Sequence, residues 1–486
     1  MASIRNRGAR RLSQAKRRHL RRRQQARARH ARRQLRGLEQ QAPSALRLLL
    51  HGLADAFTRP TYHRFGVLLL AALLTTGNHT ILNVLRTAGL PAAEHPPTDH
   101  RVFSRPPRSI WRLSQRLTHG VIEHFVPDGP VHLVGDDTVD EHRGKKVFGK
   151  GRHRDAVRSS RSYTAFRYGH KWVVLAVWVR FPFTSRPWAL PVLVVLYQNK
   201  DRSGKRRHKT PSQQMRQMLK VLLPWFPERT FAFAGGGGYG THELARPAAR
   251  RPSRLTLISR FYADANLCAP PPARTGRKTA GRPRVKGAKL PSPEKVVARN
   301  RQRQRLNVAW HGGGRRHVEV VAGTGHWYKA GEGLVQVSWV FVHDRTGTHR
   351  DEYFFTTDVR LTAQQVIECF TGRWSIETTF QEMRAYLGLE TTRGRKKDTV
   401  LRMAPCLFGL YTVVAILFAR MPARYRRVRI IDRVGKKDTT FSDAITAVRR
   451  WLWQGWVFAI PGHHAAFPKL RRPFRALLLY ALAPAA

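Results

Sequence analysis

The sequence predicts an α/β fold, in which a sheet is covered by helices. Two kinds of pattern carry this prediction. Runs of β-branched and aromatic residues bounded by turn-forming residues begin at Val131 and are typical of strands. Segments with helical periodicity lie between and after these runs, and strands combined with helices in one region indicate a layered α/β structure. A hydrophobic share of 42% is sufficient for a core, and 486 residues are enough for two to four structural units.

The N-terminal part of the chain is expected to be helical. Residues 1–40 form a basic arm rich in Arg and Gln, which would repel itself and stay disordered without a polyanion. Residues 41–128 are expected to form a helical DNA-binding domain, although helices without a role in DNA binding would show the same pattern. Ser44 is the expected N-cap of its first helix. The helix-like stretches are 44–53, 67–74, 80–90 and 109–121.

The strands are expected in the middle of the chain. They are predicted at residues 131–134, 172–181, 190–197, 230–234, 317–322 and 335–343. Helices are predicted at 213–223, at 362–389 with a break near Gly372, and at 402–420. The stretch from 269 to about 293 is rich in Pro, Gly and basic residues, so we expect an exposed loop there. Residues 426–486 are basic and aromatic, and the sequence assigns them no task.

The charge of the chain predicts a polyanionic partner. Lys and Arg total 89 against 30 Asp and Glu, a formal net charge of +59. Such a field attracts DNA, RNA or an anionic membrane surface, although a genome that favours Arg would also raise the charge. The 403–419 stretch is barely long enough to span a membrane and contains Pro405, so we expect a buried helix instead. We therefore expect a nucleic-acid-binding protein that does not span a membrane.

The cysteine and histidine patterns argue against several other classes. Cys268, Cys369 and Cys406 show no paired spacing, which excludes a disulfide framework and a thiolate metal site and fits a reducing cytosol. The 22 histidines are scattered without the spacing of a structural zinc site. The glycine run 235–238 is not followed by Lys-Ser/Thr, so it is no nucleotide P-loop. The N-terminus has no hydrophobic segment typical of a signal peptide, and the expected location is the bacterial cytoplasm, at the nucleoid.

The first candidate for chemistry is Gly135-Asp136-Asp137-Thr138, which follows the strand predicted at 131–134. Carboxylates at the C-terminal end of a buried strand lie at the rim of a sheet, where α/β proteins bind ligands. Carboxylate oxygens are also the donors that Mg²⁺ prefers. The alternative is a pair of acids that only form a turn.

The second candidate is the segment from Phe370 to Glu390. It begins with Phe-Thr and continues as GRWSIETTFQEMRAYLGLE. Arg373, Glu377 and Arg384 are four and seven residues apart, so they share one face if a single helix runs through them. Glu377 would then lie at the edge of an apolar stripe with a cation on either side, which suits a metal ligand near phosphates. The alternative is a surface Arg–Glu pair at i,i+4 spacing.

These two segments together resemble the DDE transposases of bacterial insertion sequences. Gly-Asp136-Asp137-Thr followed by Arg-Gly-Lys145-Lys146-Val-Phe-Gly is similar to their first-acid region, and the Glu377 segment is similar to the Tyr-x2-Arg-x3-Glu-x6-Lys motif of one bacterial group. Three further stretches also resemble that group: 169–173, 190–193 and 356–358. The resemblance spans most of residues 80–420.

The resemblance implies a ribonuclease-H-like catalytic domain from residues 129–244 and 361–425, with a β-rich insertion at 245–360. It implies Asp136 as the first metal ligand, Asp137 as the less favoured choice, and Glu377 as the last ligand of Mg²⁺ or Mn²⁺. Arg373, Arg384, Lys145 and Lys146 become expected DNA contacts.

The chain departs from the family pattern at three positions. Phe370 replaces the tyrosine of the motif, and Arg384 replaces its lysine. The third departure removes a carboxylate: the second aspartate of the family precedes Gly-Gly-Tyr, and Gly236 stands at that position. Two-metal phosphoryl transfer uses carboxylates to hold both ions, so the loss is expected to impair cleavage.

A short basic stretch in the predicted loop is a further candidate for DNA binding. Gly281-Arg282-Pro283-Arg284 resembles the core of an AT-hook, in which Arg side chains enter a narrow minor groove. Phosphate contacts or a merely flexible loop are the alternatives. Arg282 and Arg284 are the residues expected to contact DNA.

The sequence therefore predicts a transposase that binds the ends of an insertion sequence and performs Mg²⁺-dependent strand cleavage and strand transfer. The resemblance makes a homodimer in a synaptic complex plausible. The alternative is a catalytically impaired remnant that only binds DNA, because of Gly236. An RNA-binding protein is disfavoured, since no aromatic RNA-stacking motif is present.

Overall fold

The computed structural model describes residues 43–87, 97–105, 109–155, 158–160, 162–202, 207–272, 284–426, 438–457, 467 and 469–484, with positions 14, 15, 18, 19, 22 and 26. These residues fall into two compact units. The helical unit contains residues 1–120, 144–148 and 382–486, and the sheet unit contains residues 121–143 and 149–381. Each unit is considered by itself.

Five strands of the sheet unit form a ribonuclease-H-like sheet. Strands β1 (Val131–Glu141), β3 (Phe166–Val179) and β4 (Trp188–Tyr197) are antiparallel neighbours, while β5 (Phe231–Gly235) and β6 (Leu255–Arg260) run parallel to β1. The order across the sheet is β4-β3-β1-β5-β6. Helices α7 and α8 supply the crossovers between β4, β5 and β6, which parallel strands require. The predicted mixed sheet with flanking helices is confirmed.

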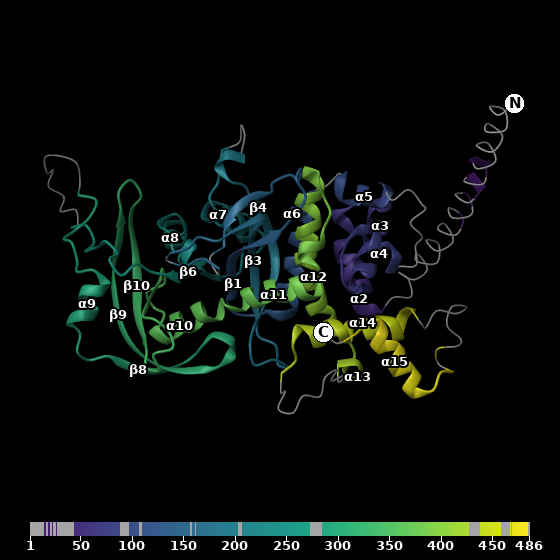
Figure 1. Ribbon diagram of the computed structural model, residues 1–486. Coiled ribbons are helices and arrows are strands. Elements are labelled where there is room, and N and C mark those ends of the chain that lie inside the picture. The colour runs from purple at the N-terminus through teal and green to yellow at the C-terminus, as the bar shows by residue number, and fades with distance from the viewer. Residues whose placement is uncertain are drawn as a thin grey trace. The chain divides into compact units, whose positions relative to one another are not determined.

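The remaining strands of the sheet unit extend this sheet beyond β6. Strand β11 (Glu352–Thr356) pairs with β6, and β10 (Gly333–Asp344), β9 (Arg315–Lys329), β8 (Gln304–Ala309) and β7 (Leu267–Cys268) follow in space. Most of these strands come from the β-rich stretch expected before Glu377 (Figure 1). The short strand β2 (Gly151–Arg154) pairs with the start of β3. The sequence missed β2, β6, β7, β8 and β11, which are short or rich in polar residues.

Helices pack on the faces of this sheet. Helix α7 (Pro211–Leu222) contacts β3 and β4, and α8 (His242–Ala249) contacts β6. Helix α10 (Ala363–Gly372) lies over β6, β8 and β11, where its Val366, Ile367 and Phe370 join a buried apolar cluster. Thr210 and Thr362 begin α7 and α10 with reciprocal side-chain and backbone hydrogen bonds to Gln213 and Gln365. The other helices of this unit are α9 (Pro293–Arg299) and most of α11 (Ser375–Tyr386).

The helical unit is a bundle around one long apolar helix. Helix α12 (Lys397–Arg420) contacts α2 (Ser44–Leu53), α3 (Arg59–Leu74), α5 (Pro97–Ser104) and α14 (Phe441–Leu452). The further helices are α4 (Ile81–Thr87), α6 (Ile110–Phe125, which continues into the sheet unit), α13 (Ala423–Arg426) and α15 (Arg472–Leu482). The expected N-cap was wrong. The helix begins at Ser44 itself, and Pro43 occupies the N-cap position without a hydrogen bond from its side chain.

Helix α12 contains the apolar stretch 403–419, for which the sequence predicts a buried helix. Its length and composition would allow it to cross a membrane, yet 72% of its most apolar window is buried inside the protein. Tyr411 donates a hydrogen bond of 2.7 Å to the buried carboxylate of Glu382. A polar contact of this kind belongs to a packed protein interior, so the prediction of a buried helix is confirmed.

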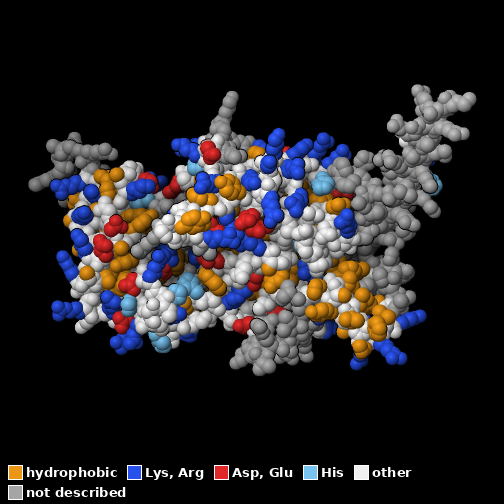
Figure 2. All heavy atoms as spheres, in the orientation of Figure 1, with side chains coloured by type: hydrophobic (Ala, Val, Ile, Leu, Met, Phe, Trp, Pro, Cys, Tyr) orange, Lys and Arg blue, Asp and Glu red, His pale blue; other side chains and the backbone are white. Residues whose placement is uncertain are grey.

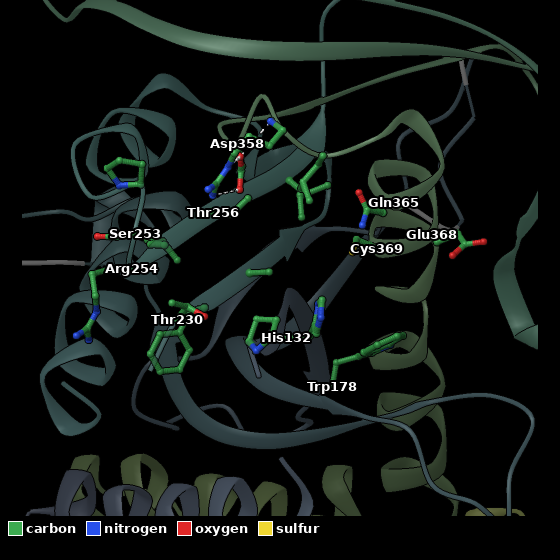
Figure 3. Close-up of a pocket in the computed structure, with 18 of the residues that line it drawn as sticks. His132, Trp178, Thr230, Ser253, Arg254, Thr256, Asp358, Gln365, Glu368 and Cys369 are labelled. Carbon is green, nitrogen blue, oxygen red and sulfur yellow. Dashed lines mark hydrogen bonds and ion pairs between the residues drawn. The ribbon is translucent and has the colours of Figure 1, made fainter. Parts of the chain in front are cut away.

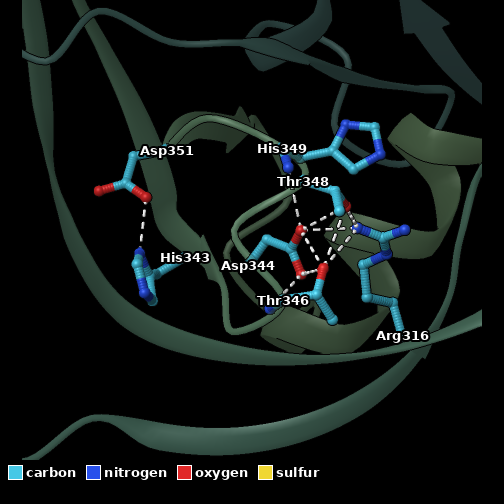
Figure 4. Close-up of polar contacts among 7 residues, drawn as sticks. All are labelled: Arg316, His343, Asp344, Thr346, Thr348, His349 and Asp351. Carbon is cyan, nitrogen blue, oxygen red and sulfur yellow. Dashed lines mark hydrogen bonds and ion pairs between the residues drawn. The ribbon is translucent and has the colours of Figure 1, made fainter.

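The turn between β10 and β11 is held by one buried carboxylate (Figure 4). The side chain of Asp344 is only 1% exposed and forms an ion pair of 2.6 Å with Arg316. It also accepts hydrogen bonds from the backbone N–H of Thr346 and His349 and from the hydroxyls of Thr346 and Thr348. Burial disfavours ionisation of Asp344, but these donors outweigh it and hold its pKa below the usual range.

Replacing Asp344 with Ala is expected to lower the free energy of unfolding by about 3 kcal/mol, because the buried donors lose their shared acceptor. Because the pKa of Asp344 is lower in the folded state, its ionised carboxylate stabilises the fold at pH values above the unfolded-state pKa of about 3.9. This stabilisation is lost progressively as the pH falls from there toward the folded-state pKa. The difference between the two proteins should therefore shrink in acid. Chemical denaturation at pH 7 and at pH 3 measures this.

Asp351→Asn is the matched control for this prediction. Asp351 pairs with His343 in the same turn region, but both side chains are largely exposed. An exposed pair contributes little, so this variant should unfold like the natural protein. Equal losses in both variants would contradict the assigned role of Asp344.

Candidate active site

Asp136 lies inside a strand and not after one. The sequence predicted that the strand ends at residue 134, but β1 continues to Glu141 because β3 remains paired with it throughout. The parallel neighbour β5 ends opposite Gly135, where the N–H of Gly236 donates to the Gly135 carbonyl at 3.3 Å. Asp136 is therefore the first residue of β1 beyond the C-terminal end of β5, at the kind of sheet position where ligands bind.

Gly236 lies directly beside the carboxylate of Asp136. A Cβ atom built on Gly236 would be 3.3 Å from Oδ1 and 3.4 Å from Oδ2 of Asp136. The backbone of Gly236 has φ −58° and ψ 172°, which any L-residue adopts. Position 236, where the family resemblance predicts a second carboxylate, is thus adjacent to the first carboxylate, and its residue carries no side chain.

Arg373 joins Asp136 to Glu377. Its guanidinium forms an ion pair with Asp136 through Nη1 and another with Glu377 through Nη2, the latter at 2.8 Å. The Arg373 side chain is 10% exposed, and its guanidinium lies 5.6 Å from the centre of the Phe370 ring. The two acids that the sequence singled out, 241 residues apart in the chain by their numbers, therefore contact a single cation.

The expected helix face through Arg373, Glu377 and Arg384 was wrong in part. Helix α10 ends at Gly372 and α11 begins at Ser375, so Arg373 occupies the break between them. This break turns the guanidinium toward Asp136 while it still reaches Glu377. Arg384 belongs to the helical unit, where it donates to Glu390 at 3.0 Å.

The carboxyl of Asp136 is poised to bind a cation. Its pKa is raised to about 6, chiefly by burial; the Arg373 guanidinium opposes this rise, and the nearby carboxylates of Asp137 and Glu377 add to it. A positive charge in contact with such a carboxyl strongly stabilises its ionised form, which burial disfavours. Perturbation of this kind in a group of convergent carboxylates is typical of functional sites.

Asp137 is engaged elsewhere. Its carboxylate forms an ion pair of 2.7 Å with Lys171 and accepts a long hydrogen bond of 3.4 Å from the hydroxyl of Tyr239. Tyr239 is buried, and burial together with the two aspartates raises its pKa above the usual value. Asp136 is therefore the residue that faces position 236, and Asp137 is committed to a different contact.

An arginine and a histidine near the site were not predicted. The guanidinium of Arg260 pairs with Glu352 and lies against Gly237, and His311 is held near Arg373. Burial and the charge of Arg373 lower the pKa of His311 to about 4, so this imidazole is neutral at pH 7. No motif in the sequence marks these residues, because their proximity depends on the β-rich strands that join the sheet.

Of the other expected DNA contacts, two belong to the helical unit, one belongs to the sheet unit and one lies outside the described residues. Lys145 and Lys146 are exposed in the helical unit, in a short segment anchored where the Phe148 N–H donates to the Arg395 carbonyl. Arg284 is exposed in the sheet unit. Arg282 lies outside the described residues.

A separate cavity of about 660 Å³ opens in the sheet unit (Figure 3). It is bounded by the first residues of β5 and β6 and by α10, and its lining includes His132, Trp178 and Cys369. The Trp178 indole N–H donates to the Gly372 carbonyl at 3.0 Å, which fixes this end of α10. The cavity lies at the opposite ends of β5 and β6 from position 236, and neither Asp136 nor Glu377 lines it.

Comparisons with known proteins identify the family of the chain. The model of the DDE superfamily endonuclease family matches residues 52–317, more than half of the chain, and that of the archaeal putative transposase ISC1217 family matches residues 291–403. No curated protein matches the chain. Among solved structures, a cryo-EM structure of the piggyBac transposase synaptic complex with hairpin DNA is similar at 10% identity and a TM-score of 0.39, over 88% of this chain and 77% of that one. The chain belongs to the DDE endonuclease superfamily.

Proposed function

We propose that this chain is a transposase, which binds the ends of an insertion sequence and cleaves DNA strands at a site built from Asp136 and Glu377. The observation that carries the proposal is the shared guanidinium of Arg373, which brings both carboxylates to one point next to position 236. Three positions from β1, β5 and α11 thus converge where the family places its three acids.

The donor set fits a divalent cation with a preference for oxygen. Two carboxylates converge on a positively charged group, and burial keeps the pKa of Asp136 raised although the Arg373 guanidinium contacts it. When bound, Mg²⁺ or Mn²⁺ would stabilise the negative charge that develops on the oxygens of the scissile phosphate. Asp136 and Glu377 would hold it.

Arg373 has a positioning role in this proposal. Its planar guanidinium satisfies both carboxylates and is itself held against the Phe370 ring. An arginine released from either carboxylate has the geometry to bind two phosphate oxygens at once. Arg373 is thus suited to orient the acids and to contact the DNA backbone.

Gly236 favours a second candidate function. A site with two carboxylates holds a metal ion less firmly than one with three, so the chain would bind DNA while cleaving it slowly or not at all. Such a remnant would occupy the ends of the insertion sequence without moving it. Position 236 alone decides between the two candidates.

The DNA partner is supported by charge. Figure 2 shows Lys and Arg side chains over much of the visible face, in keeping with the net charge of +59. The helices of residues 41–128, the insertion at 245–360, and the basic ends of the chain are the proposed DNA-contacting parts around a catalytic domain. Binding two ends at once would require a homodimer, and the proposed location is the bacterial nucleoid.

Strand cleavage by the natural chain separates the two candidates. Purified protein is incubated with DNA that flanks the coding region, with Mg²⁺ and with EDTA. The proposed enzyme gives slow nicks that EDTA abolishes and that Asp136→Asn removes. Binding without any nicks, at every protein concentration, would establish the remnant and contradict the enzyme.

Affinity for DNA is expected to fall steeply with salt. Release of counterions from six to ten neutralised phosphates lowers the affinity by about a thousandfold or more between about 50 and 200 mM salt. Fluorescence anisotropy with a labelled duplex at several salt concentrations measures the slope. An affinity that stays constant across this range would rule out electrostatic binding to the backbone.

A further inference from the structure

We propose that Asp140, His142 and His170 form a second metal site, which binds a transition-metal ion of the zinc class. Asp140 and His142 come from the end of β1 and the residues after it, and His170 comes from β3. Asp140 is the cross-strand partner of His170, and His142 is two residues beyond Asp140. This site is independent of the proposed DNA cleavage.

The geometry of the three side chains suits a tetrahedral ion. Candidate ligand atoms of all three residues lie within 4.8 Å of one another. Oδ2 of Asp140 is 3.6 Å from Nε2 of His142, and Oδ1 of Asp140 is 3.5 Å from Nδ1 of His170. Ligands about 2.1 Å from a tetrahedral zinc ion are roughly 3.4 Å apart, so each histidine nitrogen lies at about this spacing from a different oxygen of the Asp140 carboxylate.

The same separations are too long for good hydrogen bonds. Among the residues that the structure describes, Oδ2 of Asp140 and Nε2 of His142 have no hydrogen-bond partner. The Asp140 side chain is fully buried and that of His142 is 8% exposed. An unsatisfied buried polar atom is costly, and one metal ion between the three side chains would satisfy both atoms.

The surroundings orient the carboxylate for this role. The backbone N–H of His170 donates to Oδ1 of Asp140 at 3.0 Å, which fixes the plane of the carboxylate and leaves Oδ2 facing His142. Gly169 makes this approach possible, because a Cβ atom there would collide with the Asp140 carbonyl. Hydrogen bonds to ligating groups of this kind are typical of metal sites.

The donor set separates this site from the Asp136 site. Two imidazoles and one carboxylate select zinc and its neighbours in the first transition series, whereas Mg²⁺ prefers oxygen donors alone. The bound ion would fasten the end of β1 to β3 at the last pair of their ladder, Glu141 with Gly169. We therefore assign it a structural role in the sheet unit.

Metal analysis of the full chain, purified without a histidine tag, tests the proposal. About one zinc ion per chain is expected after dialysis against metal-free buffer, and almost none in His142→Ala or Asp140→Asn. His343→Ala is the matched control: it also removes a histidine beside an aspartate, but from an exposed pair 2.7 Å apart, and it should retain the zinc.

A second measurement covers variants that fail to fold. The natural chain is stripped with a chelator and titrated with Co²⁺, which should give the visible absorption of a four-coordinate ion with nitrogen and oxygen ligands. Stripping should lower Tm by several degrees, and Zn²⁺ but not Mg²⁺ should restore it. A natural chain that retains no zinc, gives no Co²⁺ band and shows no change in Tm would overturn the proposal, leaving three buried side chains that interact without a metal.

Discussion

Replacing Gly236 with Asp is expected to raise Mg²⁺-dependent cleavage of insertion-sequence ends by about a hundredfold or more, the scale on which a single charge-stabilising group acts. The Cβ atom of the new aspartate would lie 3.3 Å from Oδ1 of Asp136, which places its carboxylate within reach of an ion held by Asp136 and Glu377. Repulsion between carboxylates at this distance also raises the affinity of the site for a divalent cation, because the ion removes that repulsion.

The backbone at position 236 accepts this substitution. Gly236 has φ and ψ values open to any L-residue, and its nearest neighbours are the oxygens of Asp136, so no close contact with backbone stands in the way. The variant is expected to fold like the natural chain when the metal is present. Initial rates of nicking at saturating Mg²⁺ give the comparison.

Two controls isolate the effect of the added ligand. Gly238→Asp adds the same charge two residues away, where a Cβ atom meets nothing within 4 Å, and it should leave cleavage unchanged. Gly236→Asn adds the same shape without the charge and should not restore activity. Equal rates in the natural chain and in Gly236→Asp would contradict the assignment of position 236 as the missing ligand.

The second large effect is expected from the two remaining acids. In the Gly236→Asp background, Asp136→Asn and Glu377→Gln should each lower cleavage by about a hundredfold or more, since each removes a carboxylate from the group that stabilises the developing charge. DNA affinity, measured by anisotropy at fixed salt, should change little, because the phosphate contacts of the basic surface remain. The loss of activity should therefore appear as slower strand cleavage within the protein–DNA complex and not as weaker binding.

Asp137→Asn distinguishes the two adjacent aspartates. Asp137 is paired with Lys171 and faces Tyr239, so its removal should reduce cleavage far less than the removal of Asp136. An opposite ranking, with Asp137 essential and Asp136 dispensable, would move the site to the other face of β1.

The sequence predicted the central strands of the sheet unit well. Runs such as those around Trp172 and Leu190 are buried on both faces, so they are apolar throughout and easy to recognise. β1 was predicted too short, because Asp136 and Asp137 interrupt its apolar run while its hydrogen bonds with β3 continue. Strand β8 was missed, since three of its six residues, Gln304, Arg305 and Asn307, are polar and exposed.

The candidate site was predicted in part. Asp136, Glu377 and the gap at Gly236 were identified from motifs, and the structure brings all three positions together. The DNA contact expected of Arg373 stays a prediction. Its ion pair with Asp136 was missed, because the two residues are far apart in the sequence and become neighbours only in the fold.

The group of Asp140, His142 and His170 was missed for a different reason. The register of β1 with β3 brings His170 next to Asp140, across 30 positions of sequence. Sequence spacing alone reports ligands that are close along the chain, whereas cross-strand ligands become neighbours only after the strands pair.

A crystal structure of the Gly236→Asp variant with Mn²⁺, whose anomalous scattering locates the ion, is the most direct test of the convergence of these acids. We expect one ion about 2.1 Å from oxygens of Asp136 and of the new carboxylate, with Glu377 in its coordination sphere and Arg373 moved away from Asp136. An ion bound elsewhere, or carboxylates that stay paired with Arg373 at saturating Mn²⁺, would contradict the account.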